Sequence, residues 1–81
     1  MTKEAILKKV TQSFVKILEH HNFVLEESTT ASDVDGWESI THMLIITDIE
    51  TVFGIKFKLM ELMNMNNVGD LINCISTKLE P

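Results

Sequence analysis

The sequence predicts an all-α fold: three amphipathic helices and one short helix, packed as an antiparallel four-helix bundle with one long connection. Two observations lead to this prediction. In three segments the apolar residues recur every three or four positions, which is the spacing of a helix with one buried face. The single stretch that alternates like a strand has no partner with which to form a sheet. A chain of 81 residues is expected to form one domain, residues 1–81.

The first predicted helix extends from about Lys3 to His20. It contains neither Gly nor Pro, and its charged residues lie mostly off the apolar stripe. His20 and His21 are expected in or next to its last turn, where a cation interacts favourably with the helix dipole. The stripe itself consists of Ile6, Leu7, Val10, Phe14, Ile17 and Leu18.

The helical pattern stops between Asn22 and Glu38. Residues 28–32 form a polar tract, and residues 33–36 have the composition of a turn. A loop of this length is uncommon in a compact domain and is usually functional when it is ordered. Four apolar residues are expected to hold it against the core: Phe23, Val24, Leu25 and Trp37.

The second helix is predicted from Ser39 to Phe53, with Gly54 as a left-handed C-cap. Ile40 is interpreted as its first core contact. Residues 55–58 are interpreted as an extended connector that places Ile55 or Phe57 in the core. The predicted buried stripe of this helix is Ile45, Ile46, Ile49, Val52 and Phe53.

A short helix is predicted within residues 59–64, followed by a last helix that starts near Asn66 or Asn67. Either asparagine could cap it, and Asn67 with Asp70 three positions later resembles a capping box. The apolar face of this last helix consists of Val68, Leu71, Ile72, Ile75 and Leu79.

Charge and composition exclude several classes of function. The formal net charge of -5 argues against nucleic-acid binding and favours partners with basic surfaces. A single cysteine, Cys74, allows no intramolecular disulfide, and the N-terminus has no apolar signal-peptide core. The longest apolar run, residues 43–46, is too short to cross a bilayer. A cytoplasmic monomer is therefore expected, without a membrane span.

The sequence assembles neither a metal site nor a catalytic centre. His20 and His21 would point about 100° apart on a helix, and the zinc ligand sets are absent. A calcium loop ending on Gly36 fails because Ala31 and His42 would occupy positions that need acidic ligands. No G-x-S-x-G elbow surrounds any serine, and the chain is small for a substrate pocket. We therefore expect no enzymatic activity.

The segment from Asp35 to Ile40 remains, and it allows two interpretations. Ser39 could simply cap the second helix. It could also be modified covalently, because a hydroxyl at a helix N-terminus lies beside unpaired N–H groups that would stabilise a phosphodiester. Gly36 would allow a modifying enzyme to approach the backbone. The residues of this segment alone favour the cap.

Together these features resemble the acyl carrier protein family, in which an Asp-Ser-Leu motif opens the second helix. Here Glu38-Ser39-Ile40 occupies that place. The connector 54–57 and the polar pair plus valine at 66–68 are similar to the family's, and the resemblance covers nearly the whole chain. The apolar positions that agree are Ile45, Ile46, Ile49, Phe53, Ile72 and Ile75.

The resemblance implies a four-helix bundle of the acyl-carrier-protein type, with 4'-phosphopantetheine attached covalently to Ser39 by a Mg-dependent phosphopantetheinyl transferase that uses coenzyme A. The arm would hold acyl or aminoacyl intermediates as thioesters. Further partners would be an acyl- or aminoacyl-loading ligase and a downstream transferase or synthase. The residues expected around the attachment point are Gly36, Trp37, Glu38 and Ile40.

Departures from the family pattern favour a specialised discrete carrier over general fatty-acid synthesis. Glu replaces Asp and Ile replaces Leu beside the serine, and Trp37 also resembles discrete carriers. The second helix has few acids, so partners are expected to bind a more apolar surface: Thr41, Met43, Leu44, Asp48 and Glu50. The alternative is an unmodified helical interaction module with a carrier-like fold.

Two groups of apolar residues can each be interpreted in two ways. Leu44 and Val52 are either exposed partner contacts or part of the core, and core packing is the favoured interpretation. Four methionines could repack around an apolar chain held between the second and last helices, although ordinary core filling is favoured. These methionines are Met43, Met60, Met63 and Met65.

Overall fold

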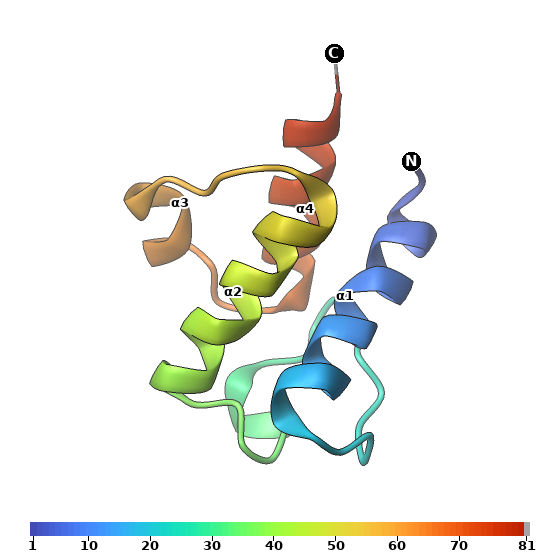
Figure 1. Cartoon of the computed structure of the whole chain (residues 1–81), viewed down its shortest axis with the longest axis vertical. Helices are drawn as coiled ribbons and strands as arrows, with labels where there is room; N and C mark the ends of the chain where they lie inside the picture. The colour runs from blue at the N-terminus through green and yellow to red at the C-terminus, as the bar shows by residue number, and fades with distance from the viewer. Residues whose placement is uncertain (81) are drawn as a thin grey trace.

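Four α-helices and one 3-10 helix make up the computed structural model, which describes residues 1–80 (Figure 1). Helix α1 packs against both α2 and α4, and the short α3 lies on the other side of α2 from α1 in the view of Figure 1. The described residues contain no strand, so the predicted all-α fold is confirmed. The elements are α1 (Lys3–Leu18), η1 (Ala31–Asp33), α2 (Ser39–Phe53), α3 (Leu59–Met63) and α4 (Val68–Leu79).

Helix α1 ends two residues earlier than predicted. Its N-terminus is capped by Thr2, whose hydroxyl accepts a hydrogen bond from the Ala5 N–H at 3.1 Å. At the other end Glu19 adopts a left-handed conformation, with φ of 60°, and its N–H bonds to the Val15 carbonyl. His20 and His21 therefore lie beyond the helix rather than in its last turn. The His20 ring instead lies 2.7 Å from the Asp35 carbonyl oxygen and joins the long loop's two ends.

The core is built from one face of each long helix. Phe14 lies at its centre, with its ring 4.8 Å from that of Trp37 and 6.1 Å from that of Phe23. Complete burial of one such side chain contributes about 1.5–3 kcal/mol. The other buried apolar side chains of the helices are Ile6 and Val10 from α1, Ile45, Ile46 and Ile49 from α2, and Val68, Leu71, Ile72 and Ile75 from α4.

The long loop is held by Leu25, Val34 and Trp37, which are all buried. Phe23 is half-buried, but Val24 is 81% exposed, so its predicted anchoring role is wrong. The physical reason is the extended chain at this point, in which successive side chains point to opposite sides. Only alternate residues of the run 23–25 can therefore reach the core.

The same loop also binds the N-terminus of α4. The N–H groups of Val68 and Gly69 donate to the carbonyls of Thr29 and Glu27, at 2.9 and 2.8 Å. These contacts satisfy two N–H groups that have no partner within the helix. Asn67 caps α4 by accepting from the Asp70 N–H at 2.8 Å, as predicted. The Asp70 carboxylate accepts from the N–H of Asn66 rather than Asn67, so the predicted box is displaced by one residue.

Gly69→Ala is expected to destabilise the fold by about 1–3 kcal/mol, because overpacking a tight contact forces the backbone to shift. An added Cβ would lie 2.9 Å from the Glu27 carbonyl oxygen, which is itself bonded to the Gly69 N–H. Urea unfolding measures the loss. Ala31→Gly, at an exposed position, is the control for errors in preparing and measuring the variants. An unchanged unfolding midpoint for Gly69→Ala would show that the loop and α4 are not in close contact.

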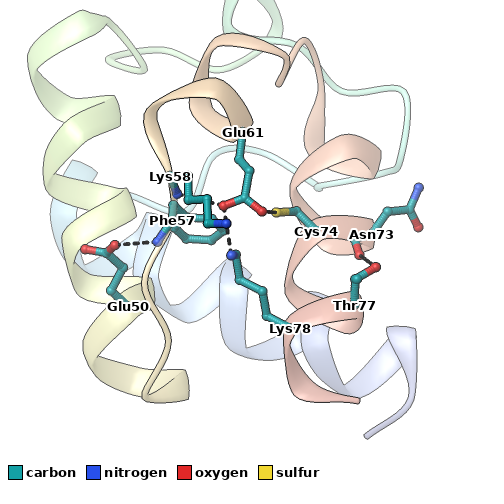
Figure 2. Close-up of polar contacts among 8 residues, drawn as sticks. All are labelled: Glu50, Phe57, Lys58, Glu61, Asn73, Cys74, Thr77 and Lys78. Carbon is teal, nitrogen blue, oxygen red and sulfur yellow. Dashed lines mark hydrogen bonds and ion pairs between the residues drawn. The ribbon is translucent and has the colours of Figure 1, made fainter. Parts of the chain in front are cut away.

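A hydrogen bond to Glu50 holds the segment that follows α2 in place. Gly54, with φ of 67°, ends the helix as predicted, and Ile55 and Phe57 are both half-buried in an extended connector. Figure 2 shows the Glu50 carboxylate accepting a hydrogen bond from the Phe57 N–H, at 2.8 Å. This contact ties the connector back to the helix from which it departs.

Helix α3 is joined to α4 through Glu61 (Figure 2). Its carboxylate accepts from the Lys58 N–H at 2.7 Å and pairs with the Lys78 ammonium at 2.8 Å. The Lys78 contact lowers the pKa of Glu61 below its usual value. Cys74 is half-buried, and its sulfur lies 3.6 Å from the same carboxylate. Burial raises the pKa of the thiol, and the negative charge of Glu61 raises it further. The thiol therefore stays protonated at neutral pH.

None of the helices within residues 1–80 combines the length and the apolar character needed to cross a bilayer.

Candidate functional site

Ser39 is the first residue of α2, and its side chain does not cap the helix. The N-cap is Glu38, whose N–H donates to the Thr41 hydroxyl at 2.8 Å. Thr41 in turn donates to the Gly36 carbonyl, which fixes the turn before the helix. Ser39 is exposed, and its hydroxyl bonds to no other residue within 1–80. The interpretation of Ser39 as a simple serine cap is therefore wrong, and its hydroxyl is available for reaction.

Gly36 and Trp37, which precede Ser39, determine where it lies. Gly36 has φ of 85°, a left-handed conformation that favours glycine, so this residue is needed for the turn itself. Trp37 is 8% exposed and packs edge-on against Phe14, with an interplanar angle of 81°. Because Phe14 is part of the core, the start of α2 is held at a defined place on the bundle.

A depression with a volume of about 350 Å³ opens beside the Ser39 hydroxyl. Its walls come from the start of α2, from η1, from the connector between α3 and α4, and from α4. The space is large enough for part of a flexible arm. The lining residues are Ala31, Trp37, Glu38, Ser39, His42, Met65, Asn66, Asn67 and Leu71.

His42 was not predicted to belong to this site. Its Nδ1 atom accepts a hydrogen bond from the Trp37 indole N–H at 3.0 Å, and the two rings stack with centroids 5.9 Å apart. Burial lowers the pKa of His42 below the usual histidine value, which keeps the ring neutral at neutral pH. The one available signal was the position of His42, three residues after Ser39 and hence one turn along the same helix.

The outward face of α2 carries several exposed apolar side chains, which corrects three predictions. Ile40 is 79% exposed rather than a core contact, and Val52 is 45% exposed rather than part of the buried stripe. Met43 and Leu44 are about half exposed, so core packing of Leu44 is also wrong. We call Ile40, Met43 and Leu44 the α2 apolar surface; it begins beside Ser39.

Met60 and Met63 are exposed as well, so ordinary core filling is wrong for them, and only Met65 among the four methionines lines the depression.

The two acids of α2 are engaged within the chain. Asp48 forms an ion pair with Lys16 of α1 at 2.8 Å, and this contact lowers the pKa of the carboxyl. Glu50 accepts from the Phe57 N–H, as described above. Thr41 also has its hydroxyl occupied in the turn before α2. Of the five predicted partner-binding residues, Met43 and Leu44 are the ones directed freely outward, and the other three have intramolecular roles.

Within residues 1–80 no three His, Cys, Asp or Glu side chains gather in a way that would hold a metal ion.

Comparisons with known proteins agree with this geometry. Residues 8–75 match the family described as "Phosphopantetheine attachment site". The chain is similar to the holo acyl carrier protein of Geobacter metallireducens, whose structure was solved by NMR in solution. The two share 38% sequence identity with a TM-score of 0.84, over 90% of this chain and 84% of the other. No curated protein matches the chain. The chain thus belongs to the acyl carrier protein family: it is a carrier with a covalently attached 4'-phosphopantetheine group, and not an enzyme.

Proposed function

We propose that Ser39 is the residue that carries the 4'-phosphopantetheine group. The observation that carries this proposal is an exposed, unengaged hydroxyl at the first position of a 15-residue helix. The first N–H groups of such a helix have no intrahelical acceptor, and with the helix dipole they favour a phosphodiester placed there. The depression beside Ser39 offers room for the adjoining part of the group.

The neighbours of Ser39 have distinct roles in this proposal. Trp37 and Gly36 position the start of α2, and Glu38 caps it through its backbone. Ile40 stands exposed directly after the serine, where an approaching transferase would contact it. The exposed acids Asp35 and Glu38 favour enzymes with a basic rim around their active sites.

The cargo is proposed to be an acyl or aminoacyl group. The terminal thiol of the arm, when attached, holds such cargo as a thioester. Tethering raises the effective concentration of the cargo at each enzyme that docks on the carrier. Residues 1–81 would act as one monomeric carrier domain in the cytoplasm, served by a phosphopantetheinyl transferase, a loading ligase and a downstream transferase or synthase.

A specialised pathway is favoured over general fatty-acid synthesis by the chemistry of α2. The acids of this helix are engaged by Lys16 and by the Phe57 N–H, and the exposed side chains left for partners are mostly apolar and carry no charge. Partner enzymes would therefore bind through apolar anchors on the α2 apolar surface, with charge contributing to encounter more than to affinity.

Intact-mass spectrometry tests the attachment. The purified chain is incubated with coenzyme A, Mg²⁺ and a broad-specificity phosphopantetheinyl transferase, and is expected to gain the mass of one arm. Fragmentation of the product should locate the added mass on Ser39. Addition at another residue, or a chain that keeps its bare mass, would contradict the proposal.

Leu44→Glu is expected to reduce transfer of cargo to the cognate enzyme at least about fivefold, because losing one apolar anchor costs more than about 1 kcal/mol of binding. The unfolding free energy should change by less than about 0.5 kcal/mol, since the side chain is already half exposed. Val24→Glu is a matched control on the long loop, where the wild-type residue is 81% exposed. Equal transfer rates for both variants would show that partners do not use the α2 apolar surface.

A further inference from the structure

We propose that Trp37 and His42 form a positioning pair for the prosthetic group, in which His42 Nε2–H donates a hydrogen bond to the phosphodiester on Ser39. This inference rests on the proposed attachment at Ser39 and goes beyond it, because it assigns a role to two side chains that the attachment itself does not require.

The first step of the argument is the rigidity of Trp37. Its ring is buried and packs edge-on against Phe14, whose side chain is fully buried in the core. The indole N–H is therefore held in one direction, and His42 lies at the end of it, 3.0 Å away and stacked at an interplanar angle of 30°. His42 is thus held at two places, by its helix and by its ring.

The second step is the protonation state of the ring. Because Nδ1 accepts a hydrogen bond from Trp37, a neutral His42 must carry its proton on Nε2. A second proton on Nδ1 would face the indole N–H, donor against donor. The hydrogen bond and the burial of the ring therefore act in the same direction, and both favour the neutral form. The result is a fixed Nε2–H donor rather than a mobile cation.

The third step is the location of that donor. Ser39 and His42 are three residues apart on α2, a spacing that puts their Cβ atoms about 5–6 Å apart. Both side chains line the same depression, and within residues 1–80 Nε2 of His42 has no hydrogen-bond partner. A phosphate oxygen attached to the Ser39 hydroxyl would lie within reach of the imidazole.

The charges around the depression explain why a neutral donor would help to stabilise the phosphodiester. Among its lining residues only Glu38 is charged, and it is anionic. The side chains contributed by η1, by the connector before α4 and by α4 itself are Ala31, Met65, Asn66, Asn67 and Leu71, all uncharged. The nearby Asp70 carboxylate is turned to the Asn66 N–H. With no cation lining the site, the phosphodiester depends on the N–H groups of α2 and on neutral donors such as His42.

NMR of the ¹⁵N-labelled protein, in its bare form and after attachment of the arm, tests the proposal. The mass of the second sample first shows that the arm is present, so failure of attachment is recognised separately. Imidazole ¹⁵N shifts should show the Nε2–H tautomer of His42 in the bare protein. In the loaded protein the midpoint of His42 titration should rise by about 0.8 pH unit, as expected for one negative charge about 4 Å away in a water-like medium. The ³¹P shift of the arm should titrate with the same midpoint.

Substitutions separate a direct contact from a purely structural role. His42→Phe should remove the pH dependence of the ³¹P shift, and His42→Gln, whose amide can donate from a similar position, should restore the neutral-pH shift. Trp37→Phe should raise the His42 midpoint in the bare protein, because the acceptor role of Nδ1 is lost. His21→Phe, at an exposed histidine beyond α1, is the matched control and should change nothing.

The outcome that would overturn the proposal needs only the wild-type chain. If His42 titrates with the same midpoint in the bare and loaded proteins, and the ³¹P shift stays flat through that range, His42 does not contact the phosphodiester. This comparison remains decisive even if His42→Phe fails to fold.

Discussion

Replacing Ser39 by alanine is expected to abolish attachment of the arm completely while leaving the protein folded. The Ser39 hydroxyl is exposed and makes no hydrogen bond within residues 1–80, so its removal should change the unfolding free energy by less than about 0.5 kcal/mol. Without an acceptor oxygen, the phosphopantetheinyl group cannot be transferred. Intact mass after incubation with coenzyme A and the transferase, together with a thermal melt, measures both effects.

Ser28→Ala is the matched control for this experiment, because Ser28 is another exposed serine, on the long loop. It should gain one arm at the wild-type rate. A mass gain by Ser39→Ala would place the attachment elsewhere in the chain. A large drop in the melting temperature of Ser39→Ala would instead show that Ser39 has a structural role, which the geometry of the N-cap does not indicate.

Phe14→Ala is expected to have the largest effect on stability. The side chain is fully buried between the rings of Trp37 and Phe23, and truncating such a residue costs about 3–5 kcal/mol. A domain of this size has roughly 4–12 kcal/mol of total stability, so much of it would be lost. Urea unfolding followed by the fluorescence of Trp37, the single tryptophan, measures the change at the site itself.

Val24→Ala provides the comparison, since Val24 is 81% exposed and its truncation should cost less than about 0.5 kcal/mol. A loss below about 1 kcal/mol for Phe14→Ala would contradict the packing of α1 against the start of α2. Because Phe14 supports Trp37, the same variant should also weaken the contact between Trp37 and His42.

Local signals predicted the helical elements well. The apolar stripe of α1, the left-handed Gly54 and the Asn67 cap each depend on residues near one another in the chain, so the sequence contains the information needed to place them. The end of α1 was missed by two residues because Glu19, a residue that favours helices, adopts a left-handed conformation there.

The faces of α2 were harder to assign for a physical reason. Apolar residues are spread around this helix and alternate with threonines, so a period of 3.6 residues does not clearly distinguish its buried face from its exposed face. Packing against α1 and the shared core buries Ile45, Ile46 and Ile49 and leaves Ile40 and Val52 outside. The sequence pattern was consistent with several rotations of the helix, and only its neighbours select one.

The sequence by itself determined a helical domain with a serine at the start of its second helix, because caps, stripes and the spacing between them are local properties, and its resemblance to acyl carrier proteins implied the carrier function. The tertiary structure decided what surrounds that serine. It paired Asp48 and Glu50 with intramolecular partners, placed Met65 and Leu71 in the same depression as Ser39, and packed His42 against Trp37. The Lys16–Asp48 pair and the depression join segments that are far apart in the chain, which no local pattern encodes. The Glu50–Phe57 and Trp37–His42 contacts join near neighbours, but they depend on how those side chains pack in the folded domain.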